Sequence, residues 1–120
     1  MITHVSIAVM YVRDQDESKA FYADQLGFEV LRDEEMFPGA RWLELRPPEG
    51  QTTIVLSAAA AFGKQPGEGA FLHFACDDIH ATVRELRDAG VTVTDPEEQP
   101  WGTFAKATDP DGHHVQIKQR

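Results

Sequence analysis

The chain has 120 residues, of which 42% are hydrophobic and 26% charged, and its formal charge at pH 7 is -9. This size and composition predict one globular domain with a substantial core. The acidic excess argues against DNA, RNA or an anionic membrane as partner, because binding to such surfaces depends on lysine and arginine. The single cysteine, Cys76, excludes an intrachain disulfide and a cysteine-rich zinc site.

The opening residues carry no targeting signal of the secretory kind. Met1-Ile2-Thr3-His4-Val5 lacks a basic stretch followed by a long apolar one, and no run of about eighteen apolar residues occurs. We therefore expect a cytoplasmic protein that does not enter membranes.

The first half predicts a strand, a helix and three more strands. Val5 to Val12 is apolar and β-branched, and the polar run from Arg13 to Glu17 ends this strand. Asp16 is expected to cap the following helix, which Gly27 ends in a left-handed conformation. The further strands are expected at Phe28 to Leu31, Trp42 to Arg46 and Thr53 to Ser57, with a turn at Pro38-Gly39.

The strand from Trp42 to Arg46 alternates cleanly. Leu43 and Leu45 fall on one face, and Trp42, Glu44 and Arg46 fall on the other. Such a pattern predicts a half-buried strand, in which Glu44 either faces a cavity or pairs with Arg41 or Arg46.

The second half repeats the first. After a connector from Ala58 to Gly69, strands and a helix are expected at Ala70 to Cys76, Ile79 to Ala89 (the helix), Thr92 to Asp95, Phe104 to Thr108 and His114 to Gln119. Gly27 overlies Gly90 with an offset of 63 residues, and the same offset carries Asp14 onto Asp77. Internal repeats are thus predicted at about 1–57 and 70–120, joined by a linker at 58–69.

Each half then reads β-α-β-β-β. A helix covers only one face of a small sheet, so the other faces must find cover or form a cavity. The prediction is an α+β fold in which tandem βαβββ modules form a cupped mixed sheet. A ferredoxin-like fold would need a second helix in each half, for which neither Met36 to Gly50 nor Asp95 to Thr108 has room.

Short motifs along the chain carry a resemblance to a known family. They are Tyr11-Val12-Arg13-Asp14, Ala20-Phe21-Tyr22, Leu26-Gly27-Phe28-Glu29-Val30, Asp77-Asp78-Ile79, Ala89-Gly90-Val91, Pro100-Trp101-Gly102 and Asp109-Pro110-Asp111-Gly112. In this order and spacing they resemble the vicinal oxygen chelate superfamily of glyoxalases, bleomycin-resistance proteins and extradiol dioxygenases. The resemblance implies that family's fold over essentially the whole chain and a small-molecule ligand. Together with open sheet edges, it also implies a homodimer.

The resemblance also implies where a divalent metal would be held. Members of the family typically use four side chains, two from each half, and the matching positions here are Ile7, Glu44, Phe71 and Gln116. Ile7 and Phe71 have no donor atom, and Gln116 is a weaker ligand than the Glu that glyoxalases place there. The resemblance therefore implies that the usual metal site is absent.

Two interpretations of the site remain open. Strand alternation puts His73 on the face of Phe71 and His114 on the face of Gln116, so His73, His114 and Glu44 form a candidate displaced site for zinc or iron. Alternatively, polar and aromatic residues line a metal-free pocket, in which Glu44 is the candidate general base. The expected lining is Ile7, Trp42, Phe71, His73, Trp101, His114 and Gln116.

Three functions follow from these interpretations. The first is a small-molecule-binding protein without the usual metal, which sequesters its ligand or acts as an enzyme of this superfamily. The second is a metal-dependent lyase, isomerase or dioxygenase that uses the displaced site. The third is a non-catalytic interaction domain.

Overall fold

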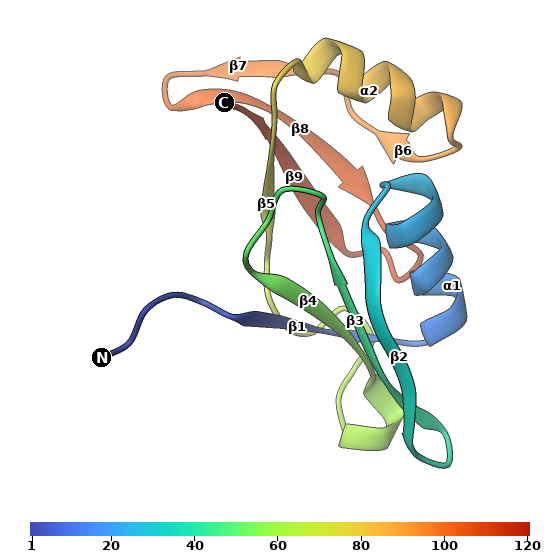
Figure 1. Cartoon of the computed structure of the whole chain (residues 1–120). Helices are drawn as coiled ribbons and strands as arrows, with labels where there is room; N and C mark the ends of the chain where they lie inside the picture. Colours follow the sequence, from blue (N-terminus) through green and yellow to red (C-terminus); the bar gives the residue numbers. More distant parts are fainter. The chain divides into compact units, whose positions relative to one another are not determined.

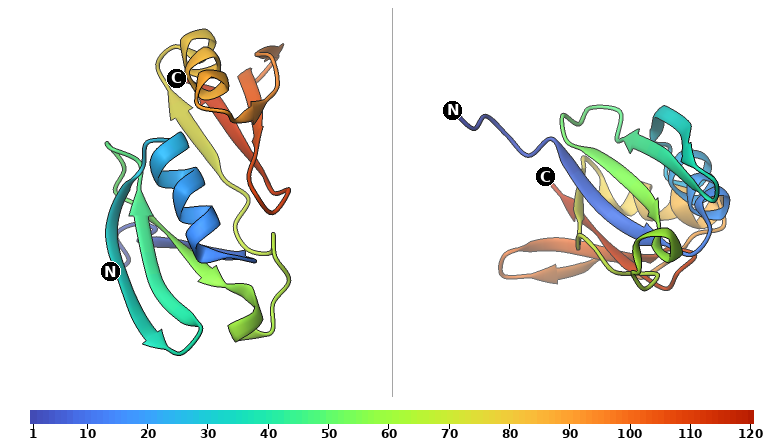
Figure 2. Two further views of the ribbon diagram at one scale, coloured as in Figure 1. Left: turned by 90° about the vertical axis from the view of Figure 1, so that its right-hand side faces the viewer. Right: turned by 90° about the horizontal axis from the view of Figure 1, so that it is seen from below.

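The computed structural model describes all 120 residues, which form two compact units, Met1–Ala70 and Phe71–Arg120. Each unit contains one mixed sheet with a helix against it (Figures 1 and 2). The predicted α+β fold is confirmed, with the order βαβββ in the first unit and one strand more, Glu97–Gln99, in the second. None of the helices is long and apolar enough to cross a membrane.

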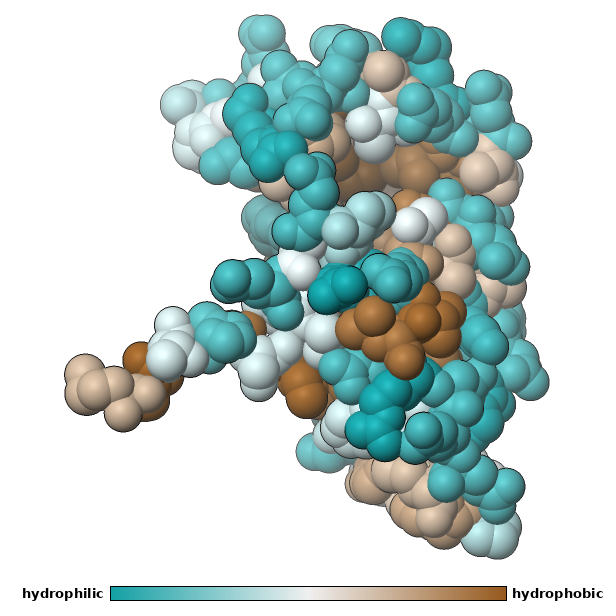
Figure 3. All heavy atoms as spheres, viewed as in Figure 1, coloured by the Kyte–Doolittle hydropathy of each residue, from teal (hydrophilic) through white to brown (hydrophobic).

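The first unit has a four-stranded sheet in the order β1-β4-β3-β2, in which β1 and β4 are parallel and the other pairs antiparallel. Residues before β1 extend past the sheet and leave Met1, Ile2 and Val5 exposed (Figure 3). The elements are β1 (Ile7–Val12), α1 (Gln15–Lys19), the π-helix η1 (Ala20–Gln25), β2 (Glu29–Phe37), β3 (Ala40–Arg46), β4 (Thr53–Ala58) and the 3-10 helix η2 (Ala59–Phe62).

Strand β2 is longer than the four residues predicted for it. It continues through the acidic run Asp33-Glu34-Glu35 and ends at Phe37, because its backbone stays paired with β3. Arg41 and Lys19 both form ion pairs with Asp33, at 2.7 and 2.8 Å. Charged residues are common on such edge strands, where they discourage pairing with other chains.

The expected connector 58–69 is partly ordered against β1. The amide of Tyr11 donates to the Glu68 carbonyl, and the amides of Gly67 and Ala70 donate to the carbonyls of Tyr11 and Val9, all at 2.8 to 2.9 Å. Gly69 has φ +115° and lies so close to β1 that a Cβ would come within 2.9 Å of the Met10 Cα. The strand predicted from Ala70 consequently begins only at His73.

The second unit has the strand order β5-β9-β8-β6, with β5 and β9 parallel and β7 paired to β8. Strand β7 was not predicted; it forms a hairpin with β8 whose turn holds Trp101 (Figure 1). The elements are β5 (His73–Cys76), α2 (Ile79–Asp88), β6 (Thr92–Val93), β7 (Glu97–Gln99), β8 (Gly102–Thr108) and β9 (His114–Gln119).

Aspartates cap both main helices, but the predicted cap Asp16 is wrong. The carboxylate of Asp14 accepts from the amides of Asp16 and Glu17, at 2.9 and 3.2 Å. Asp16 instead pairs with Arg41 at 2.8 Å. In the second unit Asp78 accepts from the Ala81 amide at 3.1 Å.

The two helical segments differ by one residue. Asp14 precedes Gly27 by 13 positions, whereas Asp78 precedes Gly90 by 12, so the offset that aligns the glycines misaligns the caps. The additional residue is accommodated by the π-helical turns of η1, in which the Leu26 amide donates to the Phe21 carbonyl at 3.0 Å. A π-helical turn closes its hydrogen bond one residue later than an α-helical turn, so it accommodates the additional residue.

Alternate residues of both sheets form the helix-facing cores. In the first unit these include Met10, Leu43, Leu45 and Leu56 together with Phe21 and Tyr22 of η1, which confirms the predicted burial of both leucines of β3. In the second unit they are Ala105, Ala107, Val115 and Ile117, with Ile79, Val83 and Leu86 of α2. The residues between them point to the opposite sheet face.

Candidate functional site

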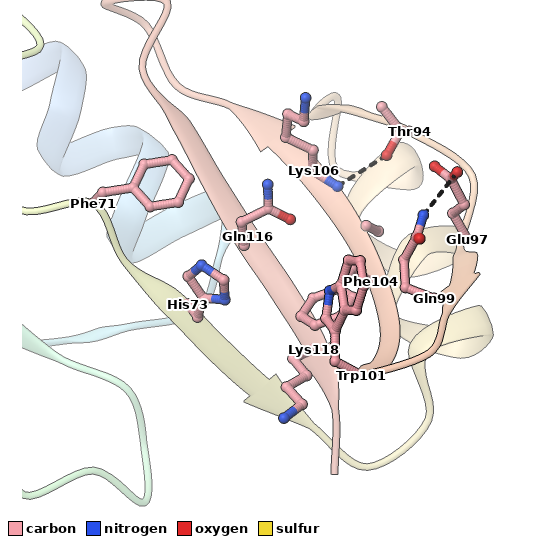
Figure 4. Close-up of a pocket in the computed structure, with 11 residues that line it drawn as sticks. Phe71, His73, Thr94, Glu97, Gln99, Trp101, Phe104, Lys106, Gln116 and Lys118 are labelled. Atoms are coloured by element: carbon pink, nitrogen blue, oxygen red, sulfur yellow. Dashed lines mark hydrogen bonds between the residues drawn. The ribbon is translucent and has the colours of Figure 1, made fainter.

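A pocket of about 610 Å³ lies within the second unit, against the face of β9 and β8 that carries Gln116 and Phe104 (Figure 4). Its wall includes Trp101 from the β7–β8 turn and Glu97 and Gln99 from β7. This volume is within the range of pockets that hold small organic ligands.

Three polar side chains form a row across the floor of this pocket. The register pairs His73 of β5 with Gln116 of β9, and Gln116 with Lys106 of β8. Paired residues on neighbouring strands share a face at a spacing of about 4.8 Å. No protein group hydrogen-bonds to the His73 imidazole, the Gln116 carboxamide or the Lys106 ammonium. The row therefore offers its donors and acceptors to whatever fills the pocket.

Aromatic rings stand on both sides of this polar row. The His73 ring makes edge-on contacts with Phe71 and Phe104, with centroid separations of 5.5 and 6.0 Å. Figure 4 shows Phe71 at one end of the pocket, Trp101 and Phe104 at the other, and Gln116 between them. Phe71 and Trp101 are 60% and 69% exposed, so their faces are available to a ligand.

Two charged side chains lie near Phe104. The Lys118 Nζ is 5.9 Å from the centroid of the Phe104 ring, a cation–π contact. Glu97 is the register partner of Phe104 on β7, and its carboxylate accepts from Gln99 Nε2 at 3.0 Å. Both therefore belong to the same end of the pocket as Trp101.

The candidate base Glu44 lies in the first unit, on β3. Its Oε1 accepts from Trp42 Nε1 at 2.8 Å, and Arg32 is its neighbour on β2. An ion pair with Arg41 or Arg46, one of the two alternatives for Glu44, does not form, because those arginines pair with other carboxylates. The pKa of Arg32 is raised, chiefly by its hydrogen bond and charge interaction with Glu34 and less by Glu44.

A smaller hollow of about 350 Å³ lies in the same unit. Trp42 lines it together with Arg32, Glu34, Glu35 and Met36 of β2. Four of the five lining residues are long, exposed side chains of an edge strand, so the hollow is a shallow feature of the sheet surface.

The predicted pocket residues divide between different places. Phe71, His73, Trp101 and Gln116 line the pocket of the second unit. Ile7 begins β1 in the first unit, beside Thr53, and His114 lies outside the pocket lining, with its Nδ1 3.3 Å from Thr108 Oγ1. The prediction missed Phe104, Lys106 and Lys118, although the alternation along β8 and β9 places them on the face of Gln116.

Two of the four positions that the resemblance assigns to metal ligands cannot bind a metal ion. Ile7 and Phe71 supply no donor atom, and no group of three or more His, Cys, Asp or Glu side chains suited to a metal ion is found. Of the displaced set, Glu44 lies in the first unit and His73 and His114 lie in the second. That set remains a prediction.

Comparison with known proteins identifies the family. The model of the Glyoxalase/Bleomycin resistance protein/Dioxygenase superfamily matches residues 2–117. The chain belongs to this superfamily.

Individual relatives are similar over nearly their full lengths. YetH of Bacillus subtilis, an uncharacterized protein, is 32% identical over 120 residues, which is 99% of this chain and 100% of YetH. TnmS3, an antibiotic binding protein from Streptomyces sp. CB03234, is 32% identical in sequence, and its crystal structure superposes with a TM-score of 0.85 over 98% of this chain and 96% of TnmS3. The crystal structure of a superfamily member from Sphaerobacter thermophilus is 30% identical in sequence and has a TM-score of 0.88, over 99% of this chain and 98% of the other.

Proposed function

We propose that this protein binds a small organic molecule in the pocket of the second unit and acts as a binding or sequestering protein. The observation that carries the proposal is the pocket's construction, in which exposed aromatic rings flank a row of polar side chains without protein partners. Ligand sites commonly combine apolar surface with a few convergent polar groups. The similarity to TnmS3, itself an antibiotic binding protein, supports the same class of function.

Ligand screening by thermal shift tests this proposal. A library of antibiotics and aromatic metabolites is expected to contain compounds that raise Tm saturably and bind with 1:1 stoichiometry in calorimetry. Trp101→Ala and Phe104→Ala should each weaken such binding about tenfold, because stacking on one ring contributes on the order of 1 kcal/mol. Arg84→Gln, which changes an exposed residue of α2, serves as the control. Compounds that bind both pocket variants as tightly as the unmodified protein would place the binding site elsewhere. A screen in which no compound binds would contradict the proposal.

The proposed binding needs no metal, because rings and hydrogen bonds from the row supply the contacts. Elemental analysis of protein purified without a metal-affinity tag is therefore expected to show no stoichiometric zinc, iron, nickel or manganese. Stoichiometric metal that disappears in His73→Ala would instead support the displaced site and a lyase, isomerase or dioxygenase activity.

We further propose that the protein is a cytoplasmic homodimer. Strand β5 is unpaired along one edge and, unlike β2, has no run of charged side chains, so this edge favours association between copies. Light scattering after size exclusion should give a mass near twice 13.4 kDa. A mass of one chain at micromolar concentration would contradict the dimer, and fractionation of the source cells would test the location.

A further inference from the structure

We infer that the pocket selects an aromatic anion: a flat ring system that carries a carboxylate or phenolate. The ring would pack against Trp101 and Phe104, and the anionic oxygen would meet the Lys106 ammonium beside the Gln116 amide. The inference rests on the proposed function and adds the chemical class of the ligand.

The first argument comes from the distribution of ion pairs. The chain has 20 acidic side chains and only 11 lysines and arginines. Seven of those cations form ion pairs with carboxylates: Arg13, Lys19, Arg32, Arg41, Arg46, Arg87 and Arg120. The remaining four are Lys64, Arg84, Lys106 and Lys118, and the last two line the pocket. Two of the four cations without an ion pair therefore lie at one concave surface, where they attract an anion.

The second argument comes from the register of β8 and β9. Gln116 lies beside Lys106, and Lys118 lies beside Phe104, so the two lysines occupy diagonal corners of one four-residue block. An oxygen placed near Gln116 can accept from its amide and from the Lys106 ammonium together. Hydrogen bonds from a cation to an anionic oxygen are about twice as strong as neutral ones.

Glu97 fixes the direction in which the ligand lies. It is the acidic side chain among the pocket residues, it pairs in register with Phe104, and Gln99 holds its carboxylate. At that end the positive charge of Lys118 is offset by Glu97, whereas no carboxylate lines the pocket beside Lys106, so a ligand anion would be attracted toward Lys106. The ring therefore belongs at the Trp101 and Phe104 end, and the anionic group belongs over the polar row.

Matched probes that share a naphthalene ring and differ in the charge of its substituent test the inference. The probes are 2-naphthoate, 2-naphthamide and 2-naphthylmethylammonium, measured by calorimetry and by quenching of Trp101 fluorescence. The chain has two tryptophans, so Trp42→Phe leaves Trp101 as the sole indole reporter. Naphthoate is expected to bind saturably and at least tenfold more tightly than the amide. The ammonium compound should not bind.

Variants then connect that preference to the lysines. Lys106→Gln should weaken naphthoate binding roughly tenfold and leave the amide unaffected, since only the charged hydrogen bond is lost. Lys106→Gln combined with Lys118→Gln should abolish the preference. Arg84→Gln removes an equal charge from the exposed surface of α2 and should change neither. Unchanged circular dichroism and Tm confirm that each variant is folded.

Two results would overturn the inference. In one, the three probes bind equally or none binds. In the other, Arg84→Gln weakens naphthoate as much as Lys106→Gln does, which would indicate general charge attraction. Neither result would decide the broader proposal that the pocket binds a small molecule. Compounds of other chemistry found in the library screen, with binding that Phe104→Ala weakens, would still support that proposal.

Discussion

Trp42 and Glu44 lie two residues apart on β3, and the indole Nε1 of Trp42 donates to the Glu44 carboxylate at 2.8 Å. Alternation along the strand places both on the same face, and each has a charged neighbour on β2, Glu34 beside Trp42 and Arg32 beside Glu44. The hydrogen bond thus holds a large ring flat along the strand and occupies one oxygen of the candidate base.

Removing this donor should have a measurable but modest effect on stability. Trp42→Phe keeps an aromatic ring and loses the N–H, so we expect a loss of about 1 kcal/mol in the free energy of unfolding, since both side chains are only half-buried. Urea denaturation of Trp42→Phe, Glu44→Met, which removes the acceptor, and the double variant gives the coupling between the two side chains. Purely additive losses would show that the hydrogen bond contributes nothing in solution.

The close approach of Gly69 to β1 predicts a large effect of one methyl group. Gly69→Ala would push a Cβ into the backbone of Val9 and Met10 at a φ that L-residues rarely adopt, so a loss of about 3 kcal/mol is expected. Gly67→Ala is the matched control, because its φ is also positive, at +94°, but nothing lies within 4 Å of the added carbon. It should cost about 1 kcal/mol. Equal losses in urea denaturation would mean that the contact with β1 is unimportant.

Gln15 connects α1 to two strands through a buried amide. Its Nε2 donates to the carbonyls of Arg41 and Leu56, both at 2.8 Å, and its Oε1 accepts from the Arg41 amide at 3.1 Å. Gln15→Met leaves these groups without partners and should cost about 2 to 4 kcal/mol.

Gln15→Glu should be worse at neutral pH, because a carboxylate would face two carbonyl oxygens. Its penalty should shrink as pH falls and the carboxyl becomes protonated, whereas the penalty of Gln15→Met should not depend on pH. Urea denaturation at pH 8 and pH 5 compares the two. A pH-independent loss for Gln15→Glu would show that the side chain turns away to solvent.

Asp33 predicts an acid-dependent contribution to stability. Hydrogen bonds from Lys19 and Arg41 lower the pKa of Asp33 from its ordinary value of 3.8. A carboxyl whose folded pKa is lowered stabilises the fold above the unfolded value and loses that contribution as pH falls through the folded value. Asp33→Asn should therefore be less stable than the unmodified protein above about pH 4, with the difference closing at lower pH. Asp88→Asn, which changes an exposed carboxylate of α2, should show no such convergence.

The helix ends and the buried faces were predictable because glycine positions and side-chain alternation indicate them directly. Gly27 and Gly90 end both helices with positive φ, and the leucines of β3 alternate with its polar residues. Strands β2 and β7 were underestimated or missed because they are edge strands held by backbone pairing. Their side chains are exposed and largely charged, so the sequence shows no alternation of apolar and polar residues there.

The site was predictable only where the family resemblance pointed to it. Phe71, Trp101 and Gln116 followed from that resemblance, His73 followed from its alternation with Phe71, and the structure places all four in one pocket. Lys106 was missed because a lysine between small residues has the pattern of an ordinary surface position. Its place in the pocket depends on which residue of β9 lies beside it. The register between two strands cannot be derived from the sequence of one strand alone.

The two faces of strand β8 have different surroundings. Ala105 and Ala107 are buried beneath α2, while Phe104 and Lys106 point to the pocket. Under the proposed function, a substitution at either pocket position would change ligand binding and leave the packing against α2 intact. New ligand preferences could then arise through single substitutions on the pocket face of the strand, and we expect sequence variation among relatives to concentrate there.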